Sequence, residues 1–332
     1  MLPIDISDLQ KIGCVLIGRN EGQRLTYAIT SIPETIRQRS VYVDSGSTDG
    51  SQDYARTQGL QLVELSPDMP FTAARARNAG AKKLLENNPE LDFIQFFDGD
   101  CTLIPGWIET AISFLKNHPD TALVCGRRRE RHPHQSIYNW LCDVEWNTPL
   151  GITQSCGGDF LIRAEVFEQV NGFSSDLIAG EEPDMCFRIR KLGHTIYRIN
   201  HDMTYHDANI TTFQQWFKRS IRAGYAYSEA VVRHRHEPNG YWRRNLIRLL
   251  FWGITLPTIV VATALSIHPV FSALLVIYPA HVIHIALRSK IKEHKWMYGL
   301  FMMISKFSET FGLLLYLRNR LLSHSARLIE YK

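Results

Sequence analysis

The first hundred residues alternate between short apolar runs and amphipathic stretches. The apolar runs are rich in Val, Ile, Leu and Phe, as in buried strands, and lie at 11–18, 40–44, 60–65 and 91–100. Helical spacing or helix end signals mark the stretches between them, at 19–32, 51–59 and 72–88. This alternation predicts an α/β fold with a mostly parallel sheet, helices on both faces, and ligands beyond the carboxyl ends of the strands.

The pattern becomes mixed in the next hundred residues. Segment 106–119 predicts a helix, and 121–131 predicts a strand with a basic end. Segments 157–173 and 180–199 each run from a polar loop into a helix, and the second then continues into a short strand.

Two segments near the C-terminus have a different character. Residues 249–267 and 270–287 contain no Asp, Glu, Lys or Arg, and each approaches the roughly 20 residues that span a hydrocarbon core. Only His268 and Pro269 separate them, which predicts a helical hairpin with a tight turn. Basic residues flank both outer ends, so the positive-inside rule places the preceding domain on the cytoplasmic side of the plasma membrane. A buried helix pair in a soluble protein and a re-entrant hairpin are the alternatives.

Two further helices are expected beside this hairpin. Segment 213–232 interleaves aromatic residues with Lys and Arg, which is typical of a helix in the membrane interface or of an amphipathic packing helix. Segment 296–322 contains Lys306 and Glu309, so we expect an interfacial or packing helix rather than a third crossing.

Composition narrows the class of protein. The 332 residues carry a net charge of +4, which does not indicate nucleic acid as a partner and is compatible with a membrane surface. The six cysteines form no C-x-x-C pair, which argues against a zinc ribbon or a secreted disulfide framework and favours a reducing compartment. The first apolar run is too short for a signal peptide.

Two acids one residue apart close the fourth predicted strand. In an extended chain the side chains of Asp98 and Asp100 point the same way, and their charges repel unless a cation lies between them. Mg²⁺ or Mn²⁺ bridging to a diphosphate suits such an oxygen pair. His206, which follows the last predicted strand, is a candidate third ligand. A turn built from Asp and Gly, and an ordinary surface or core histidine, are the alternatives.

Other acids also follow predicted strands or begin helices. Asp44, after the second strand, can accept hydrogen bonds from a nucleobase or ribose, or can build its own loop. Glu181, Glu182 and Asp184 begin a helix, where the dipole favours acids and where one of them is a candidate general base. The first strand is not followed by G-x-G-x-x-G or by a P-loop, which argues against dinucleotide oxidoreductases and P-loop enzymes.

Six segments follow one another in a characteristic order: VLIGRNEGQRL, VYVDSGSTDGS, ARNAGAKKL, FFDGDC, GGDFLIRAEVFEQVNGF and GEEPDMCFRIRKLG. Together, over about residues 11–210, they resemble the family 2 glycosyltransferases. The apolar tail resembles that of bacterial members that act in cell-surface polysaccharide or lipid-linked glycan assembly. The resemblance implies a GT-A fold and an inverting, metal-assisted transfer of one sugar from a nucleotide-sugar to a hydroxyl of a lipid-linked or saccharide acceptor.

The resemblance also implies roles for individual residues. The implied donor-binding residues are Asn20, Glu21, Asp44, Arg77, Asn78 and Asp98. The implied metal ligands are Asp98, Asp100 and His206, for Mg²⁺ or Mn²⁺. Acceptor or donor-sugar contacts fall on Gly157, Gly158 and Asp159. The base falls on Glu182, where the family has Asp after a Glu, so Glu181 stays open as an alternative and Asp184 as a weaker one.

The expected organisation has four parts. They are a GT-A catalytic domain at 1–210 (nucleotide-sugar half about 1–104, acceptor half about 105–210), an interfacial helix and linker at 211–245, a membrane hairpin at 246–290 and an amphipathic helix and tail at 291–332. The Q-x-x-R-W signature of processive synthases is not matched by QQWFKRS, which favours single-sugar transfer over polymerisation. A nucleotidyltransferase and a non-catalytic membrane scaffold are the competing hypotheses.

Overall fold

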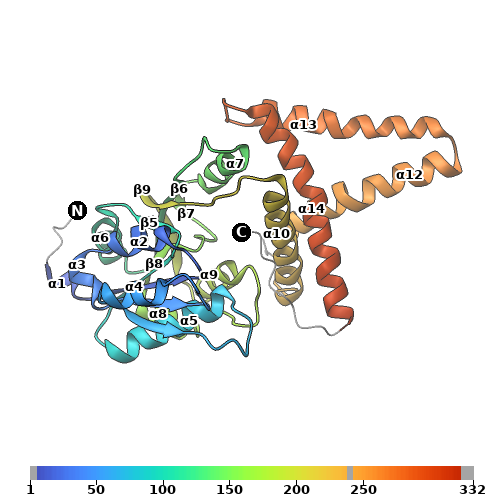
Figure 1. The fold of residues 1–332 in the computed structure, drawn as a ribbon. Coiled ribbons are helices and arrows are strands. Elements are labelled where there is room, and N and C mark those ends of the chain that lie inside the picture. Colours follow the sequence, from blue (N-terminus) through green and yellow to red (C-terminus); the bar gives the residue numbers. More distant parts are fainter. Residues whose placement is uncertain (1–5, 238–241, 323–332) are drawn as a thin grey trace. The chain divides into compact units, whose positions relative to one another are not determined.

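The structure is a computed structural model, and it describes residues 6–237 and 242–322 (Figure 1). The chain divides into two compact units, Met1–Thr211 and Thr212–Lys332, each of which is described by itself. Residues 1–5 and 323–332, at the outer ends of the first and last predicted parts, lie outside the described residues, as does 238–241 within the predicted linker.

The first unit contains the sheet and its covering helices. The strands are β1 Ile12–Gly18, β2 Val41–Asp44, β3 Gln61–Glu64, β4 Phe93–Asp98, β5 Cys101–Leu103, β6 Thr121–Glu130, β7 Gly151–Ile152, β8 Phe160–Arg163 and β9 Thr195–His206. The helices are α1 Ile6–Leu9, α2 Gln23–Thr30, α3 Glu34–Arg37, α4 Ser51–Thr57, α5 Ala73–Asn87, α6 Trp107–Asn117, α7 Ile137–Trp146, α8 Ala164–Gln169 and α9 Glu181–Lys191.

The sheet is parallel in its first half and mixed in its second half. Its strand order is β3-β2-β1-β4-β8-β6-β9-β5, with β7 paired to β9. β3, β2, β1 and β4 pair in parallel, as the sequence predicts, whereas β8 is antiparallel to both β4 and β6. In register, Gly18 lies opposite Asp44, and Ile17 lies opposite Asp98. The carboxyl ends of β2 and β4 therefore flank the end of β1.

Burial explains why this sheet has helices on both faces. β1, β2 and β4 carry consecutive buried residues rather than an alternating pattern, so both faces of these strands are covered. α5 packs against β1 and β2, and α6 packs against β6, β8 and β9. The ring of Phe96 lies 5.2 Å from that of Phe160 and 5.2 Å from that of Phe167, which joins β4, β8 and α8 in one core.

The structure corrects the predicted assignment of three segments. Segment 157–173 contains the strand β8 between its loop and its helix, where the sequence indicated only a loop and a helix. The short strand β5 was also missed, and β9 runs on to His206 rather than ending at residue 199. These strands are short or polar, and only their partners across the sheet reveal them.

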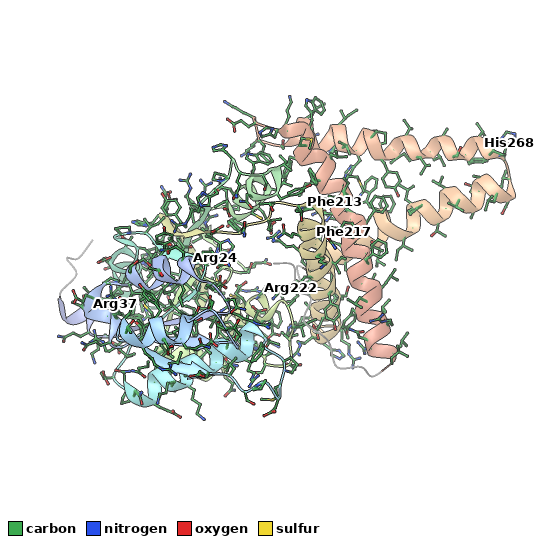
Figure 2. The ribbon with its side chains drawn as sticks, in the orientation of Figure 1. Arg24, Arg37, Phe213, Phe217, Arg222 and His268 are labelled. Carbon is green, nitrogen blue, oxygen red and sulfur yellow. The ribbon has the colours of Figure 1, made fainter. Side chains whose placement is uncertain are left out.

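The second unit consists of helices (Figure 1). They are α10 Phe213–Arg233, α11 Trp242–Leu250, a π-helical turn Phe251–Thr255, α12 Leu256–Ser266, a 3₁₀ segment Pro269–Val276, α13 Ile277–Arg288 and α14 Lys295–Leu321. Figure 2 shows His268 at the tip of the hairpin formed by α12 and α13, where the sequence predicts the turn. Pro257 has no N–H to donate to the carbonyl of Gly253, and the π-helical turn lies at this point.

Within residues 6–237 and 242–322, three helical stretches are long and apolar enough to cross a membrane: Trp242–Ser266, Pro269–Arg288 and Lys295–Leu321. Only 11% and 6% of the apolar windows of the first two are buried, compared with 50% for the third. The third, α14, packs closely on α10, and glycines permit this approach. A Cβ at Gly224 would collide with the backbone of Glu309, and a Cβ at Gly312 would collide with the backbone of Ile221. The hairpin helices therefore expose their apolar side chains, whereas α14 has a protein partner along half of its window.

Candidate active site

The carboxylate of Asp98 is bound by a buried arginine. Arg77 lies near the start of α5, and its Nη2 donates to Asp98 Oδ1 at 2.7 Å. The same guanidinium donates through Nη1 to Glu181 Oε1 at 2.9 Å. Burial on its own raises the pKa of Asp98, but the positive charges of Arg77 and Arg128 outweigh it and lower the pKa overall. Asp98 is therefore ionised, and the positive charges of Arg77 and Arg128 balance its negative charge.

Helix packing places Arg77 at this position. Gly80 lies one turn further along α5 and faces β1 and β2, where a Cβ would come within 2.5 Å of Val15 Cγ1 and 2.8 Å of Val43 Cγ2. The missing side chain allows the helix to lie close against the sheet. The A-R-N-A-G segment thus combines a charged residue for the strand ends with a glycine that brings the helix near them.

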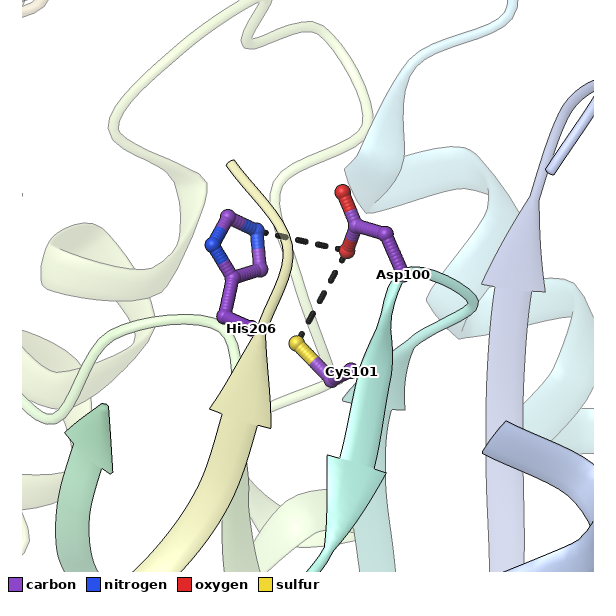
Figure 3. A group of neighbouring side chains, drawn as sticks. All are labelled: Asp100, Cys101 and His206. Carbon is purple, nitrogen blue, oxygen red and sulfur yellow. Dashed lines mark hydrogen bonds and ion pairs between the residues drawn. The ribbon is translucent and has the colours of Figure 1, made fainter. Parts of the chain in front are cut away.

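The second acid of the pair contacts a histidine instead (Figure 3). Asp100 Oδ1 lies 3.3 Å from His206 Nε2 and 3.7 Å from the Sγ of Cys101. The antiparallel pairing of β5 with β9 sets Cys101 opposite His206, so the register of these two strands brings the imidazole to the acid. The side chains of Asp100, Cys101 and His206 could together hold a metal ion, as could those of Asp98, Cys101 and Asp159.

This geometry corrects one step of the sequence argument. β4 ends at Asp98, a turn follows at residues 99–100, and β5 begins at Cys101. The alternation rule for an extended strand therefore does not apply between Asp98 and Asp100, and each carboxylate faces its own partner, Arg77 or His206. Asp100 and His206 offer one oxygen and one nitrogen ligand. The carboxylate oxygen suits Mg²⁺ or Mn²⁺, whereas an imidazole nitrogen is more typical of Zn²⁺ and other transition metals.

A glycine loop lies against the Asp98 cluster. A Cβ at Gly158 would lie 2.7 Å from Arg77 Nη2 and 3.1 Å from both Arg128 Nη2 and Asp98 Oδ2. Asp159, the next residue, is fully buried, and it accepts from Arg128 at 2.7 Å and from the Thr204 hydroxyl at 2.6 Å. Its carboxylate therefore holds Arg128 beside Asp98, while Gly158 allows the close approach of the loop and Gly157 adopts a φ of +86°.

The three acids at the start of α9 have three different environments. Glu181 is paired with Arg77. Glu182 accepts through Oε1 from the backbone N–H of Cys156 at 2.6 Å and from the thiols of Cys156 and Cys186 at 3.1 and 2.9 Å. Burial raises the pKa of Glu182, although these hydrogen bonds partly offset it. Asp184 accepts from the Ser174 hydroxyl at 2.7 Å, and from Arg188 one turn along the helix.

The predicted donor-binding residues at the ends of β1 and β2 form one network. Asp44 is buried, and its Oδ2 accepts from the N–H groups of Gly46 and Ser47 and from the Gln52 amide at 2.8–3.0 Å. Asn20 accepts through Oδ1 from Thr48 N–H at 2.8 Å. Both side chains thus fix the 45–52 loop, and direct contact with a nucleobase stays a prediction.

Glu21 and Asn78 also have protein partners. Glu21 lies 2.9 Å from Arg24. Asn78 donates to the Phe173 carbonyl at 2.7 Å and accepts from the Phe173 N–H at 2.8 Å, so it anchors the loop that leads to α9. The structure therefore gives Asn78 a positioning role, and a direct donor contact stays a prediction for both residues.

Sequence reasoning missed Arg128, Cys156 and Cys186. Arg128 belongs to a basic run at the end of β6, in which the period of two places it on the opposite face from Arg127 and Arg129. That alternation was a usable signal. No local pattern pointed to the two cysteines, because they are thirty residues apart and meet only through folding.

The family model described as Glycosyl transferase family 2 matches residues 14–167, which include most of β1, all of β2 to β8, and the acids Asp98 and Asp100. Over these residues the chain contains a family 2 glycosyltransferase domain. Glu181 and Glu182 lie beyond the matched residues. A second model, described as the N-terminal domain of galactosyltransferase, matches residues 141–211.

Two curated relatives each match part of this chain. An O-antigen chain rhamnosyltransferase of Salmonella anatum is 27% identical over 197 residues, 54% of this chain and 61% of that protein. A pre-mycofactocin glycosyltransferase of Mycobacterium tuberculosis is 24% identical over 229 residues, 65% of this chain and 46% of that protein. The matched part is thus about half to three fifths of the length of these relatives.

A solved structure supports the fold of this chain. A mannosyltransferase of Pyrobaculum calidifontis, in complex with GDP-mannose and Mn²⁺, superposes with a TM-score of 0.65 at 17% identity, covering 92% of this chain and 87% of that chain. At this identity the likeness shows a shared fold, and the predicted GT-A fold is confirmed.

Proposed function

We propose that this chain is a membrane-associated inverting glycosyltransferase that moves one sugar from a nucleotide-sugar to a hydroxyl of a lipid-linked or saccharide acceptor. The observation that carries the proposal is the double pairing of Arg77 with Asp98 and Glu181. It sets the acids at the end of β4 beside those at the start of α9. The nucleotide-sugar bound to the mannosyltransferase neighbour supports the class of donor.

Glu182 is the proposed base. A general base has to face the acceptor hydroxyl, whereas Glu181 Oε1 faces the Arg77 guanidinium at 2.9 Å. The Oε1 atom of Glu182 contacts an N–H group and two thiols, all uncharged donors, and burial raises its pKa, so it takes up a proton more readily than an ordinary carboxylate.

The proposed reaction is a single displacement. The acceptor oxygen attacks the anomeric carbon while the bond to the diphosphate breaks, and its proton passes to Glu182. Arg77 and Arg128 keep Asp98 ionised and hold the strand end in place. A divalent cation, for which Asp100 and His206 offer ligands, would supply positive charge to the departing diphosphate. The product has the inverted anomeric configuration.

The apolar helices support membrane association. The exposed hairpin of α12 and α13 lacks charged residues between its basic flanks, so we propose that it enters the bilayer with the catalytic domain on the cytoplasmic side. A membrane segment in the same chain raises the local concentration of a lipid-linked acceptor. We also propose that the chain has the four parts predicted from the sequence, namely the catalytic domain, the interfacial helix with its linker, the membrane hairpin and the C-terminal amphipathic helix with its tail. Transfer is proposed to require Mg²⁺ or Mn²⁺.

A donor screen tests the proposal. The purified full chain in detergent is incubated with a panel of nucleotide-sugars and Mn²⁺, and released nucleotide is identified. We expect nucleoside diphosphate from one donor, with loss of turnover in Glu182→Gln and an inverted product by NMR. Release of pyrophosphate would instead indicate a nucleotidyltransferase. If no donor in the panel releases any nucleotide, the chain is a non-catalytic scaffold. Glu168→Gln, the same change at an exposed position on α8, is the matched control and should keep wild-type turnover, and circular dichroism checks that both variants fold.

A further inference from the structure

Two cysteines and the proposed base form a compact group of their own. The Sγ atoms of Cys156 and Cys186 are 3.7 Å apart, and the Oε1 atom of Glu182 lies 3.1 Å from the first and 2.9 Å from the second. Glu182 and Cys186 are four residues apart in α9, so they share one face of the helix. Cys156 approaches them from the loop before Gly157.

We propose that Cys156, Glu182 and Cys186 bind a thiophilic divalent cation of the Zn²⁺ class, and that its binding inhibits transfer. A tetrahedral ion with Zn–S bonds of about 2.3 Å holds two sulfurs about 3.8 Å apart, close to the separation of these thiols. A sulfur and a carboxylate oxygen on such an ion lie about 3.5 Å apart, so Glu182 would have to withdraw by about half an ångström.

The ligand chemistry distinguishes this site, which offers two thiols, from the group of Asp100, Cys101 and His206, which offers one. Thiolates select Zn²⁺ and related ions, whereas carboxylate oxygens suit Mg²⁺ and Mn²⁺. Two sulfurs in contact with one carboxylate therefore recognise a different class of ion from the one proposed to assist transfer. Cys156 is half-buried rather than fully enclosed, which gives the ion a route to the group.

The site has the character of a regulatory rather than a structural centre. It offers three ligand atoms, whereas structural zinc sites close with four protein ligands. Two of the three ligands, Cys156 and Cys186, are thiols, which bind such an ion only after losing their protons. An arriving ion has to displace them, which weakens binding and makes occupancy reversible.

Inhibition is the part of this inference that rests on the proposed function. An ion coordinated by Glu182 occupies the lone pairs that would accept the proton of the acceptor hydroxyl. Binding itself does not depend on that role, so the two can be measured separately.

Binding is tested with Co²⁺ alone as the probe. The full chain in detergent, kept reduced by a phosphine, is titrated with Co²⁺, and thiolate-to-cobalt charge-transfer absorption is recorded. We expect one equivalent to saturate the absorption and Zn²⁺ to abolish it. Cys156→Ser and Cys186→Ser should each lose the signal, while Cys142→Ser, a buried cysteine on α7, should keep it. Absence of the signal from the wild type, or its persistence in both loop and helix variants, overturns the site.

The inhibition arm uses the donor found by the screen, with Mg²⁺ present. Zn²⁺ should lower wild-type turnover more than tenfold and lower that of Cys186→Ser less than twofold, each relative to its own zinc-free rate. If Zn²⁺ displaces Co²⁺ but turnover continues, the result supports the metal site and contradicts the role of Glu182 as the base. If the enzyme is active but gives no thiolate-to-cobalt absorption, the result contradicts the metal site and leaves the proposed function supported.

Discussion

The guanidinium of Arg77 donates to Glu181 across 104 positions of sequence, at 2.9 Å. Its other nitrogen holds Asp98, so a single side chain ties the end of a strand to the start of a distant helix. The side chain of Arg77 is only 4% exposed, and a buried cation of this kind is retained only where anions face it. The pairing makes the organisation of the whole cluster depend on one residue.

Loss of that cation should destabilise the first unit. Arg77→Met leaves Asp98 and Glu181 near each other without a positive partner, and we expect a loss of about 3–5 kcal/mol in the free energy of unfolding. Denaturant titration of the full chain in detergent measures it. Arg75→Met, in the same helical turn but bonded to exposed backbone carbonyls, is the matched control and should cost less than about 1 kcal/mol. Equal losses of unfolding free energy in Arg77→Met and Arg75→Met would show that the buried ion pairs stabilise the protein no more than exposed hydrogen bonds do.

The pH dependence of transfer should report Glu182. A base acts in its ionised form, and burial raises the pKa of Glu182 above the 4.5 of an ordinary glutamate. The rise of kcat/KM with pH should therefore lie above that value. Cys186→Ala removes a hydrogen bond that lowers the pKa, so the rise should move to still higher pH. A profile that is the same in the wild type and Cys186→Ala would contradict the assignment.

The glycine loop should not accept a side chain. In Gly158→Ala the new Cβ would lie 2.7 Å from Arg77 Nη2 and 3.1 Å from Asp98 Oδ2, so the ion pair must shift. We expect kcat/KM to fall by at least about tenfold, since a displacement of this size at a catalytic cluster is costly. Gly59→Ala is the control, because Gly59 has a φ of +81° and open space around it. Gly59→Ala should lower the free energy of unfolding and leave kcat/KM unchanged. If Gly158→Ala has wild-type kinetics, the glycine loop does not need to lie close to the ion pair.

Removal of divalent ions should stop transfer. EDTA should abolish turnover, and added Mg²⁺ or Mn²⁺ should restore it. Asp100→Asn and His206→Ala should each need at least about tenfold more metal for half-maximal activity, since each deletes one ligand. His134→Ala changes an exposed histidine and should leave the metal requirement as it is. Full turnover in chelated buffer would exclude the metal role of Asp100 and His206.

Close packing of α10 and α14 should depend on their glycines. Gly312→Val would force side-chain atoms into the backbone of α10, at a cost of about 1–3 kcal/mol for an overpacked contact. Thermal unfolding in detergent, followed by tryptophan fluorescence, measures the loss. Leu314→Val, at a half-exposed position on the same helix, is the control. A melting temperature that matches the control would mean that the two helices are not held at this contact.

The sequence allowed the first half of the fold to be predicted and left the second half uncertain. The run at 11–18 and the strand before Asp98 were recognisable because buried parallel strands are continuously apolar. β5 and β8 were missed because three or four residues carry too little periodicity, and the mixed pairing around β8 depends on contacts between distant segments. The hairpin turn at His268 was predictable because two continuous apolar segments are separated there only by His268 and Pro269.

By itself, the sequence determined which residue types stand at strand ends and helix starts, because apolar periodicity and end signals act over a few neighbouring residues. Tertiary structure alone decided how their charges are partnered. Asp98 faces Arg77, Asp100 faces His206, and Glu182 lies between two thiols. These partners are far apart in the chain, and electrostatic and hydrogen-bonding forces act on distance in space, which only the packed sheet and helices establish.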